Sequence, residues 1–390
     1  VIPFTADAVA LSFLPLSHVF ERMLDYAYLH KTASIAYAES IEKLAANFLE
    51  VNPHCFGAVP RVYEKVFAKI QAKAEAGGAL KKRLFDWAVR IGRSRVPYLE
   101  RGEPLPSELA WRAKLADALV LKKIRAALGT SFRFAVSGGA PLSRDLAEFF
   151  IGAGVQIYEG YGLTETSPVI CVNGPGRFRV GTVGRPLRGI EVRIASDGEI
   201  LTRGPHIMKG YFHKAEATAE AIDREGWLHT GDIGDLRDGY LSITDRKKDL
   251  IVLAGGKKAA PQPIENELKK SPYIALPIVI GDRQKFLAAV LVPDFDRLRH
   301  WAEAAGVHVN WSALDAQPEV RRLFQSEIDA YNENRPHHEQ IRAFALLPSD
   351  LTIEDGSITP TLKVKRRILE SRYASLIEQM YAAAQKSHVA

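Results

Sequence analysis

The chain has 390 residues, enough for two or three domains, and its 47% hydrophobic and 25% charged content is typical of a soluble globular protein. Its two cysteines, Cys55 and Cys171, exclude a disulfide framework and a structural zinc site, and we expect a cytoplasmic protein. No apolar run approaches the roughly 18 residues of a membrane-spanning helix. The net charge of +6 suits anionic partners such as nucleotides or a lipid surface.

The first part of the chain predicts short strands that alternate with helices. Apolar runs indicate strands over 9–16 and 35–38 and a helix over 41–49. His18 stands where the first strand turns into a helix. A packed, hydrogen-bonded histidine is the default interpretation of this residue, and a role in a site is the alternative.

Residues 60–128 follow a helical pattern. Val62, Val66 and Ile70 recur at four-residue spacing, and Gly77-Gly78 breaks the first helix. Lysines and arginines are interleaved with a second apolar stripe over 84–91. A solvated basic face is the first interpretation of this region, and contact with a membrane surface is the second. We expect no nucleic-acid partner.

A strand–turn–helix–strand unit follows over 132–158. The first strand turns at Gly138 and Gly139, Ser143 can cap the helix, and the second strand covers 155–158. Such a βαβ arrangement favours a parallel sheet. Gly138 and Gly139 would then lie beside the residues that follow Tyr158, at the carboxyl ends of adjacent strands, where open α/β sheets bind ligands.

Residues 158–168, which read YEGYGLTETSP, are the most informative stretch of the chain. Their glycines let the backbone approach a ligand closely. Tyr161 offers a flat ring on which a base can stack, Thr164 offers a hydroxyl group, and Glu165 offers an oxygen ligand suited to Mg²⁺. The glycines alone would fit an ordinary strand-exit turn, but several stretches downstream fit the same chemistry.

After residue 180 the pattern changes to short alternating runs. Asp197-Gly198 lies between two of these runs and is a hairpin signal, so 181–245 predicts a small antiparallel β subdomain. The charged run 245–249 indicates a domain boundary. Beyond it, 246–390 has α+β character, with strands over 274–280 and 286–292 and a basic helix over 366–381. We therefore predict an α/β fold, in which 1–180 form a large part with parallel βαβ units.

Four stretches of the chain carry a resemblance together, because they follow one another in the order and at the distances of one known family. They are 158–168, 226–234, 245–267 and 359–367. On these stretches the sequence resembles the adenylate-forming (AMP-binding) superfamily, and within it most closely the long-chain fatty-acid–CoA ligases, over nearly the whole chain. The resemblance implies ATP-dependent activation of a fatty acid to an acyl-adenylate, followed by transfer to coenzyme A. It also implies Mg²⁺ as cofactor and ATP, fatty acid and coenzyme A as substrates.

The same resemblance assigns roles to individual residues. Tyr161 would stack on adenine, Thr164 would bind the α-phosphate, and Glu165 would hold Mg²⁺, so that Thr164 and Glu165 also count as catalytic residues. Asp232 and Arg246 would bind the ribose. The residues assigned to the nucleotide are Gly138, Gly139, Ala140, Glu159, Gly160, Tyr161, Gly162, Thr164, Asp232, Arg246 and Lys248.

In the C-terminal part, the resemblance implies a hinge at 245–248, about which the small α+β domain rotates between the two half-reactions. Lys365 would be the catalytic lysine, with Lys363 as the alternative; one of the two belongs to the solvated face of the last helix. The resemblance also assigns residues to the other two substrates. Gly255, Gly256 and Lys257 would contact coenzyme A, and His18 would lie at the acyl side of the site.

The sequence departs from the family at one point. The family's early phosphate loop, rich in Ser, Thr and Gly, is not found, and we expect it upstream of Val1, so that the chain would be the C-terminal part of a ligase. Two rival hypotheses remain. One is another adenylate-forming enzyme, such as an aryl- or medium-chain–CoA ligase or a carrier-protein loading enzyme. The other is a non-catalytic nucleotide-binding module.

Overall fold

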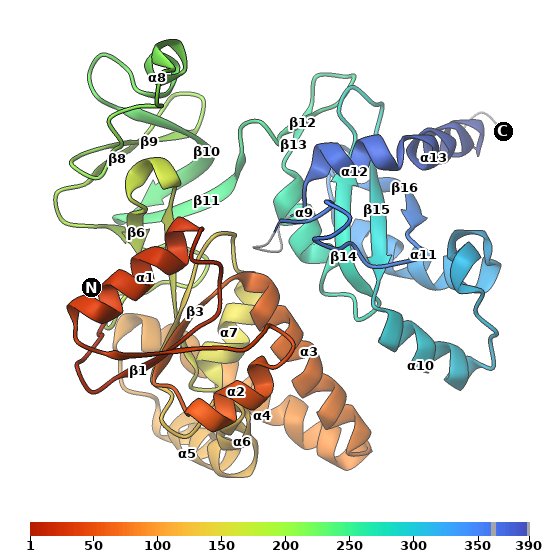
Figure 1. The fold of residues 1–390 in the computed structure, drawn as a ribbon. Coiled ribbons are helices and arrows are strands. Elements are labelled where there is room, and N and C mark those ends of the chain that lie inside the picture. The colour runs from red at the N-terminus through yellow and green to blue at the C-terminus, as the bar shows by residue number, and fades with distance from the viewer. Residues whose placement is uncertain (360–363, 388–390) are drawn as a thin grey trace. The chain divides into compact units, whose positions relative to one another are not determined.

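The computed structural model describes residues 1–359 and 364–387, which divide into two compact units (Figure 1). The first unit comprises Val1–Thr230 and Gly234–Ile243, and the second comprises Gly231–Ile233 and Thr244–Ala390. The division at Thr244 lies next to the predicted hinge at 245–248. Rotation about that hinge stays a prediction.

The first unit is built on a seven-stranded sheet with the order β2-β1-β3-β4-β5-β6-β7. Strands β1 to β5 pair in parallel, whereas β6 and β7 are antiparallel to their neighbours. The parallel part follows from the alternation of strands and helices along the chain. The strands are β1 (Val9–Ser12), β2 (Ser34–Tyr37), β3 (Cys55–Ala58), β4 (Phe134–Ser137), β5 (Gln156–Gly162), β6 (Val169–Val172) and β7 (Arg185–Pro186).

Helices cover this sheet and form the largest hydrophobic core with it. α4 packs against α5 and α7, and aromatic side chains such as Phe56, Phe149 and Phe150 are fully buried. The helices are α1 (Val19–His30), α2 (Leu44–Val51), α3 (Pro60–Ala76), α4 (Ala79–Arg101), α5 (Ser107–Ala116), the π-helical η1 (Asp117–Leu121), α6 (Lys122–Ala126) and α7 (Arg144–Gly152). Ser143 caps α7, as predicted, by accepting a hydrogen bond from the Leu146 N–H.

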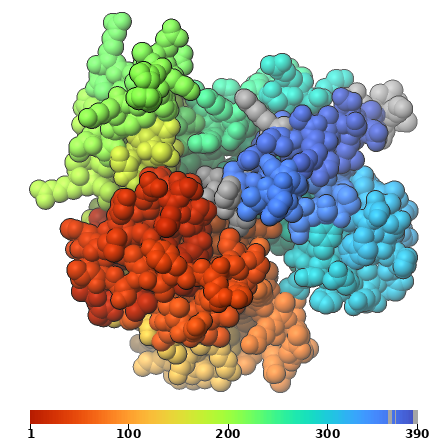
Figure 2. All heavy atoms as spheres, in the orientation of Figure 1, coloured from red at the N-terminus to blue at the C-terminus, as the bar shows by residue number. Residues whose placement is uncertain are grey.

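A four-stranded sheet in the order β11-β10-β9-β8 completes the first unit and carries the short helix α8 (Ala215–Ala221). In Figure 2 this region is green and lies above the red part of the same unit. β8 and β9 form the hairpin predicted at Asp197-Gly198. The strands are β8 (Glu191–Ile194), β9 (Glu199–Arg203), β10 (Leu228–Arg237) and β11 (Tyr240–Arg246).

The second unit contains a three-stranded sheet in which β15 lies between β14 and β16. The predicted C-terminal helix is broken at Tyr373 into two helices. The elements are β12 (Ile251–Val252), β13 (Lys258–Ala259), α9 (Pro261–Leu268), β14 (Ile274–Ile280), β15 (Leu287–Pro293), α10 (Phe295–Ala305), η3 (Trp311–Ala316), α11 (Pro318–Asn332), β16 (Ile341–Leu346), α12 (Arg366–Arg372) and α13 (Ala374–Ser387).

The structure confirms the predicted α/β class, with a parallel sheet, an antiparallel sheet and a C-terminal α+β unit. Within the described ranges, no helix combines the length and the apolar character that crossing a bilayer requires.

Candidate functional site

The glycine turn and the tyrosine-rich motif lie at neighbouring strand ends, as the βαβ pattern predicted. β4 and β5 are parallel neighbours, and Ser137 is the register partner of Glu159. The chain leaves β4 through Gly138, Gly139 and Ala140, so this loop begins beside Glu159, where the parallel pairing of β4 with β5 ends. The arrangement matches the place where open α/β sheets bind ligands.

The motif strand is longer than predicted. β5 continues to Gly162, four residues beyond Tyr158, because it pairs with the antiparallel strand β6. Gly162 approaches the backbone so closely that a Cβ atom there would lie 1.6 Å from the carbonyl oxygen of Pro168. Only glycine fits this position, so the turn between β5 and β6 is determined by a close backbone approach.

The turn at 163–168 is held by its own hydrogen bonds. Thr166 is fully buried, and its Oγ1 donates to the Pro168 carbonyl oxygen at 2.6 Å and accepts from the Leu163 N–H at 2.9 Å. Thr164, Glu165 and Thr166 form the 3₁₀ turn η2. Thr164 is exposed and Glu165 is half-buried. The hydroxyl and the carboxylate that the sequence assigned to phosphate and Mg²⁺ therefore stand on a rigid turn.

Tyr161 is only 8% exposed. Its ring packs into a small apolar cluster that includes Ile170 from β6, Ile200 from β9 and Leu241 from β11. The ring is therefore fixed between the two sheets of the first unit. Stacking of adenine on Tyr161 stays a prediction.

Glu165 makes a contact that the sequence did not indicate. The Tyr211 hydroxyl group donates a hydrogen bond to Glu165 Oε1 at 3.0 Å, across 46 residues of sequence. Among the residues that the structure describes, no group of three or more His, Cys, Asp or Glu side chains could hold a metal ion. A single carboxylate nevertheless fits Mg²⁺, which proteins commonly bind with one or two carboxylates together with substrate phosphates and water.

Glu159 is a buried acid in the middle of β5, beside the last residue of β4. Its side chain is 8% exposed, and burial raises the pKa of its carboxyl group to about 8, although a hydrogen bond with the Leu142 backbone opposes the shift. The carboxyl group is therefore predominantly neutral at pH 7 and able to donate a hydrogen bond. Whether it contacts a nucleotide stays a prediction.

The two residues assigned to the ribose meet in the second unit. Asp232 is 6% exposed, and Nε of Arg246 donates to its Oδ1 at 3.1 Å. The Lys247 N–H also donates to the Gly231 carbonyl oxygen at 2.8 Å, which ties the two segments together. A guanidinium group thus holds the carboxylate in place, whereas Lys248 is exposed in the turn after β11.

The residues assigned to coenzyme A and to the catalytic lysine lie in exposed segments of the second unit. Gly255, Gly256 and Lys257 occupy the turn between β12 and β13. Lys365 is exposed and directly precedes α12, while its backbone N–H donates to the Ser357 carbonyl oxygen at 2.8 Å. Lys363 lies outside the described residues.

His18 acts in the structure as the N-cap of α1. Its Nδ1 accepts a hydrogen bond from the Phe20 N–H at 3.2 Å. This geometry matches the default interpretation of a hydrogen-bonded histidine, and its role at the acyl side stays a prediction.

Solved structures of adenylating enzymes share this fold. The adenylation domain of a carboxylate reductase from Mycobacterium chelonae aligns with a TM-score of 0.74 and 23% identity, over 96% of this chain and 54% of that one. The anthranilate–CoA ligase AuaEII, solved with anthranoyl-AMP, aligns with a TM-score of 0.65 and 18% identity, over 100% of this chain and 61% of that one. The fold is therefore that of adenylating enzymes.

Sequence comparisons extend this result to the family. The model of the AMP-binding enzyme family matches residues 2–212, and that of the AMP-binding enzyme C-terminal domain matches 248–385. The chain belongs to the AMP-binding enzyme family. Long-chain-fatty-acid–CoA ligase FadD15 of Mycobacterium tuberculosis is 40% identical over 378 residues, which are 95% of this chain and 62% of that protein. Human long-chain-fatty-acid–CoA ligase 1 is 33% identical over 96% of this chain and 55% of its own length.

Proposed function

We propose that this protein is an AMP-forming long-chain fatty-acid–CoA ligase that uses ATP and Mg²⁺. The observation that carries the proposal is the 40% identity, over 95% of the chain, to a mycobacterial protein of that name. The strand-end loop with Thr164 and Glu165 and the buried pair of Asp232 and Arg246 supply groups that suit a nucleotide.

In the first half-reaction, a carboxylate oxygen of the fatty acid attacks the α-phosphorus of ATP. The bond from that phosphorus to the bridging oxygen breaks, and pyrophosphate leaves. The Thr164 hydroxyl group orients the α-phosphate, and the Glu165 carboxylate contributes an oxygen ligand to Mg²⁺. When bound, Mg²⁺ supplies positive charge against the phosphate oxygens. Lys365 adds a second positive charge where negative charge develops.

Asp232 accepts hydrogen bonds from the ribose hydroxyl groups. Because Arg246 already holds one oxygen of this carboxylate, its orientation is determined before the nucleotide arrives. Glu159, Gly160 and the loop Gly138–Ala140 line the base.

In the second half-reaction, the sulfur of coenzyme A attacks the acyl carbon of the adenylate. A thioester bond forms, the bond from the acyl carbon to the phosphate oxygen breaks, and AMP leaves. The thiol proton is released to solvent or base. The exposed turn at Gly255–Lys257 presents the Lys257 cation to this anionic substrate.

The proposal is tested by offering the full-length protein a series of fatty acids with ATP, Mg²⁺ and coenzyme A and measuring AMP and thioester. We expect both products in equal amounts, with long-chain acids preferred. Preference for aryl acids would favour the rival ligase hypothesis. AMP binding without any turnover would contradict the proposal and favour a non-catalytic binding module.

We also propose that the start of α4 contacts an anionic membrane surface. Leu80 is 82% exposed there, Leu84 is 37% exposed, and Lys81, Lys82 and Arg83 follow the exposed apolar side chain. Exposed leucine beside basic residues suits the interface of a bilayer. Sedimentation with phosphatidylserine vesicles at low salt tests this contact. Loss of pelleting in a Leu80→Ser, Lys81→Glu variant would support it, and no pelleting of the wild type would contradict it.

A further inference from the structure

A loop from the four-stranded sheet holds Glu165 at two points. The Met208 N–H donates to the Glu165 carbonyl oxygen at 2.8 Å, and the Tyr211 hydroxyl group donates to the Glu165 carboxylate at 3.0 Å. One bond is to the backbone of Glu165, and the other is to its side chain. The segment after β9 therefore determines both where Glu165 stands and how its carboxylate is turned.

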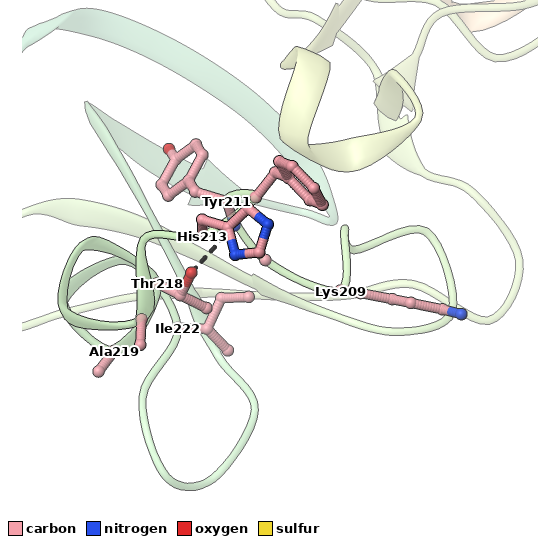
Figure 3. Close-up of a pocket in the computed structure, with 9 residues that line it drawn as sticks. Lys209, Tyr211, His213, Thr218, Ala219 and Ile222 are labelled. Carbon is pink, nitrogen blue, oxygen red and sulfur yellow. Dashed lines mark hydrogen bonds between the residues drawn. The ribbon is translucent and has the colours of Figure 1, made fainter.

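Tyr211 itself is held by α8. Thr218 Oγ1 accepts a hydrogen bond from the Tyr211 N–H at 2.9 Å and donates to the Lys214 carbonyl oxygen at 2.8 Å, and Figure 3 shows the Thr218 hydroxyl group beneath the Tyr211 backbone. Gly210 has φ +146°, and a Cβ atom there would lie 2.7 Å from the Thr218 side chain. The backbone of Tyr211 is therefore fixed before any ligand binds.

Gly210, Tyr211 and Thr218 line a surface pocket of about 550 Å³, together with Phe212, Ala219 and Ile222 (Figure 3). Tyr211 is 38% exposed, so its phenol is not required to fill a core. Its hydroxyl group instead donates to the Glu165 carboxylate.

We propose that Tyr211 is a positioning residue, which fixes one oxygen of the Glu165 carboxylate so that the other oxygen faces the Mg²⁺ of the bound nucleotide. This inference rests on the proposed function, because it concerns the metal-dependent binding of ATP. A carboxylate turns freely about its last torsion unless a partner holds it. Partners of metal-binding groups typically contribute roughly ten- to hundredfold to metal affinity or activity.

The test is Tyr211→Phe in the full-length protein, a change that removes one hydroxyl group and keeps the ring. ATP binding is measured by calorimetry across a series of Mg²⁺ concentrations, and AMP binding is measured without Mg²⁺. We expect the Mg²⁺ concentration for half-maximal ATP binding to rise roughly tenfold, while AMP binding stays unchanged. Phe212→Ala is the matched control on the same loop, because Phe212 is 86% exposed and has no polar group, and it should leave both measurements unchanged.

The second measurement compares the Mg²⁺ dependence of ATP binding in Glu165→Gln with that in the double variant that also carries Tyr211→Phe. If Tyr211 acts through the carboxylate, Tyr211→Phe should add little to the shift that Glu165→Gln produces by itself. If Glu165→Gln changes the Mg²⁺ dependence and Tyr211→Phe does not, the positioning role is wrong and the proposed function stands. If ATP binding of the wild type does not respond to Mg²⁺ and the enzyme releases no AMP, both the proposed function and this inference are overturned.

Discussion

Most candidate residues of the first unit lie in tightly packed backbone or are at least partly buried, with Thr164 exposed, whereas most of those in the second unit are exposed. Gly162 touches the Pro168 backbone, Thr166 is fully buried, and Glu159 is 8% exposed. By contrast, a Cβ atom added at Gly255 would meet only open space, and Lys365 is exposed. Asp232 lies between these extremes, because it is buried and paired with the exposed Arg246.

Under the proposed function, this difference would correspond to two kinds of chemical task. Groups that hold a nucleotide in one geometry act best when the fold orients them in advance. Groups that act in only one half of a two-step reaction need freedom to meet the substrate and leave it. Substitutions in the embedded region should therefore change stability and binding together, while those in the exposed region should change a single chemical step.

The largest effect is expected for Gly162→Ala. The new Cβ atom would overlap the Pro168 carbonyl oxygen, so the turn must open, and we expect a loss of roughly 4 kcal/mol in the free energy of unfolding. Gly255→Ala is the matched control, because its surroundings are open, and it should change stability by less than about 0.5 kcal/mol. Urea denaturation of both variants tests this, and equal losses would contradict the comparison.

The next effect concerns Lys365→Met. We expect pyrophosphate release to fall by roughly a hundredfold or more, because positive charge is lost at the transferring phosphate. Stability should stay unchanged, since Lys365 is exposed. Thioester formation from supplied acyl-adenylate should be retained, whereas Lys257→Met should weaken that step alone. Wild-type pyrophosphate release in Lys365→Met would make Lys363 the candidate.

A smaller effect is expected for Asp232→Asn, which keeps the shape of the side chain and removes its charge. AMP binding should weaken about tenfold, close to 1.4 kcal/mol, because the ribose loses a charged acceptor. Asp238→Asn is the control, since Asp238 forms an exposed ion pair with Arg179 at 3.0 Å in the turn after β10. Calorimetric titration with AMP distinguishes the two, and equal affinities would remove Asp232 from the site.

The last prediction concerns pH rather than a single substitution, and it comes from the buried carboxyl group of Glu159. Because burial raises the pKa of this carboxyl group from 4.5 to about 8, the folded protein binds more protons than the unfolded chain between those values. Stability should consequently fall as the pH rises through this window, by at most about 1.4 kcal/mol per pH unit. In the Glu159→Gln variant the side chain stays neutral at every pH, so its free energy of unfolding should fall less over the same window. Urea denaturation at pH 5.5 and 8 tests this; parallel losses would show that Glu159 does not titrate in the window.

Much of the fold could be predicted from sequence patterns. The strand predicted over 274–280 matches β14, and the Asp197-Gly198 signal matches the hairpin of β8 and β9. β3 was missed because four residues between His54 and Val59 are too few to show a period. β10 was missed because its start, 228–233, overlaps a stretch interpreted as a motif rather than a strand.

The candidate site could be predicted from the sequence only in part. The sequence indicated which residue types carry the chemistry, and the strand order implied that Gly138 and Glu159 lie at adjacent strand ends. The hydrogen bond from the Tyr211 hydroxyl group to Glu165 could not be predicted, because it joins residues 46 positions apart and no periodic pattern marks it. The same holds for the neutral state of Glu159, which depends on burial rather than on residue type.

The sequence by itself determined the family, the order of the chemical groups along the chain and the parallel sheet, because these follow from motifs, glycine positions and local alternation. The tertiary structure alone decided which groups are buried, which are paired and which are exposed. Burial raises the pKa of Glu159, the approach of Pro168 requires glycine at 162, and the fold of the β9–α8 segment brings Tyr211 to Glu165. Each of these depends on atoms that are distant in sequence, and packing alone brings them together.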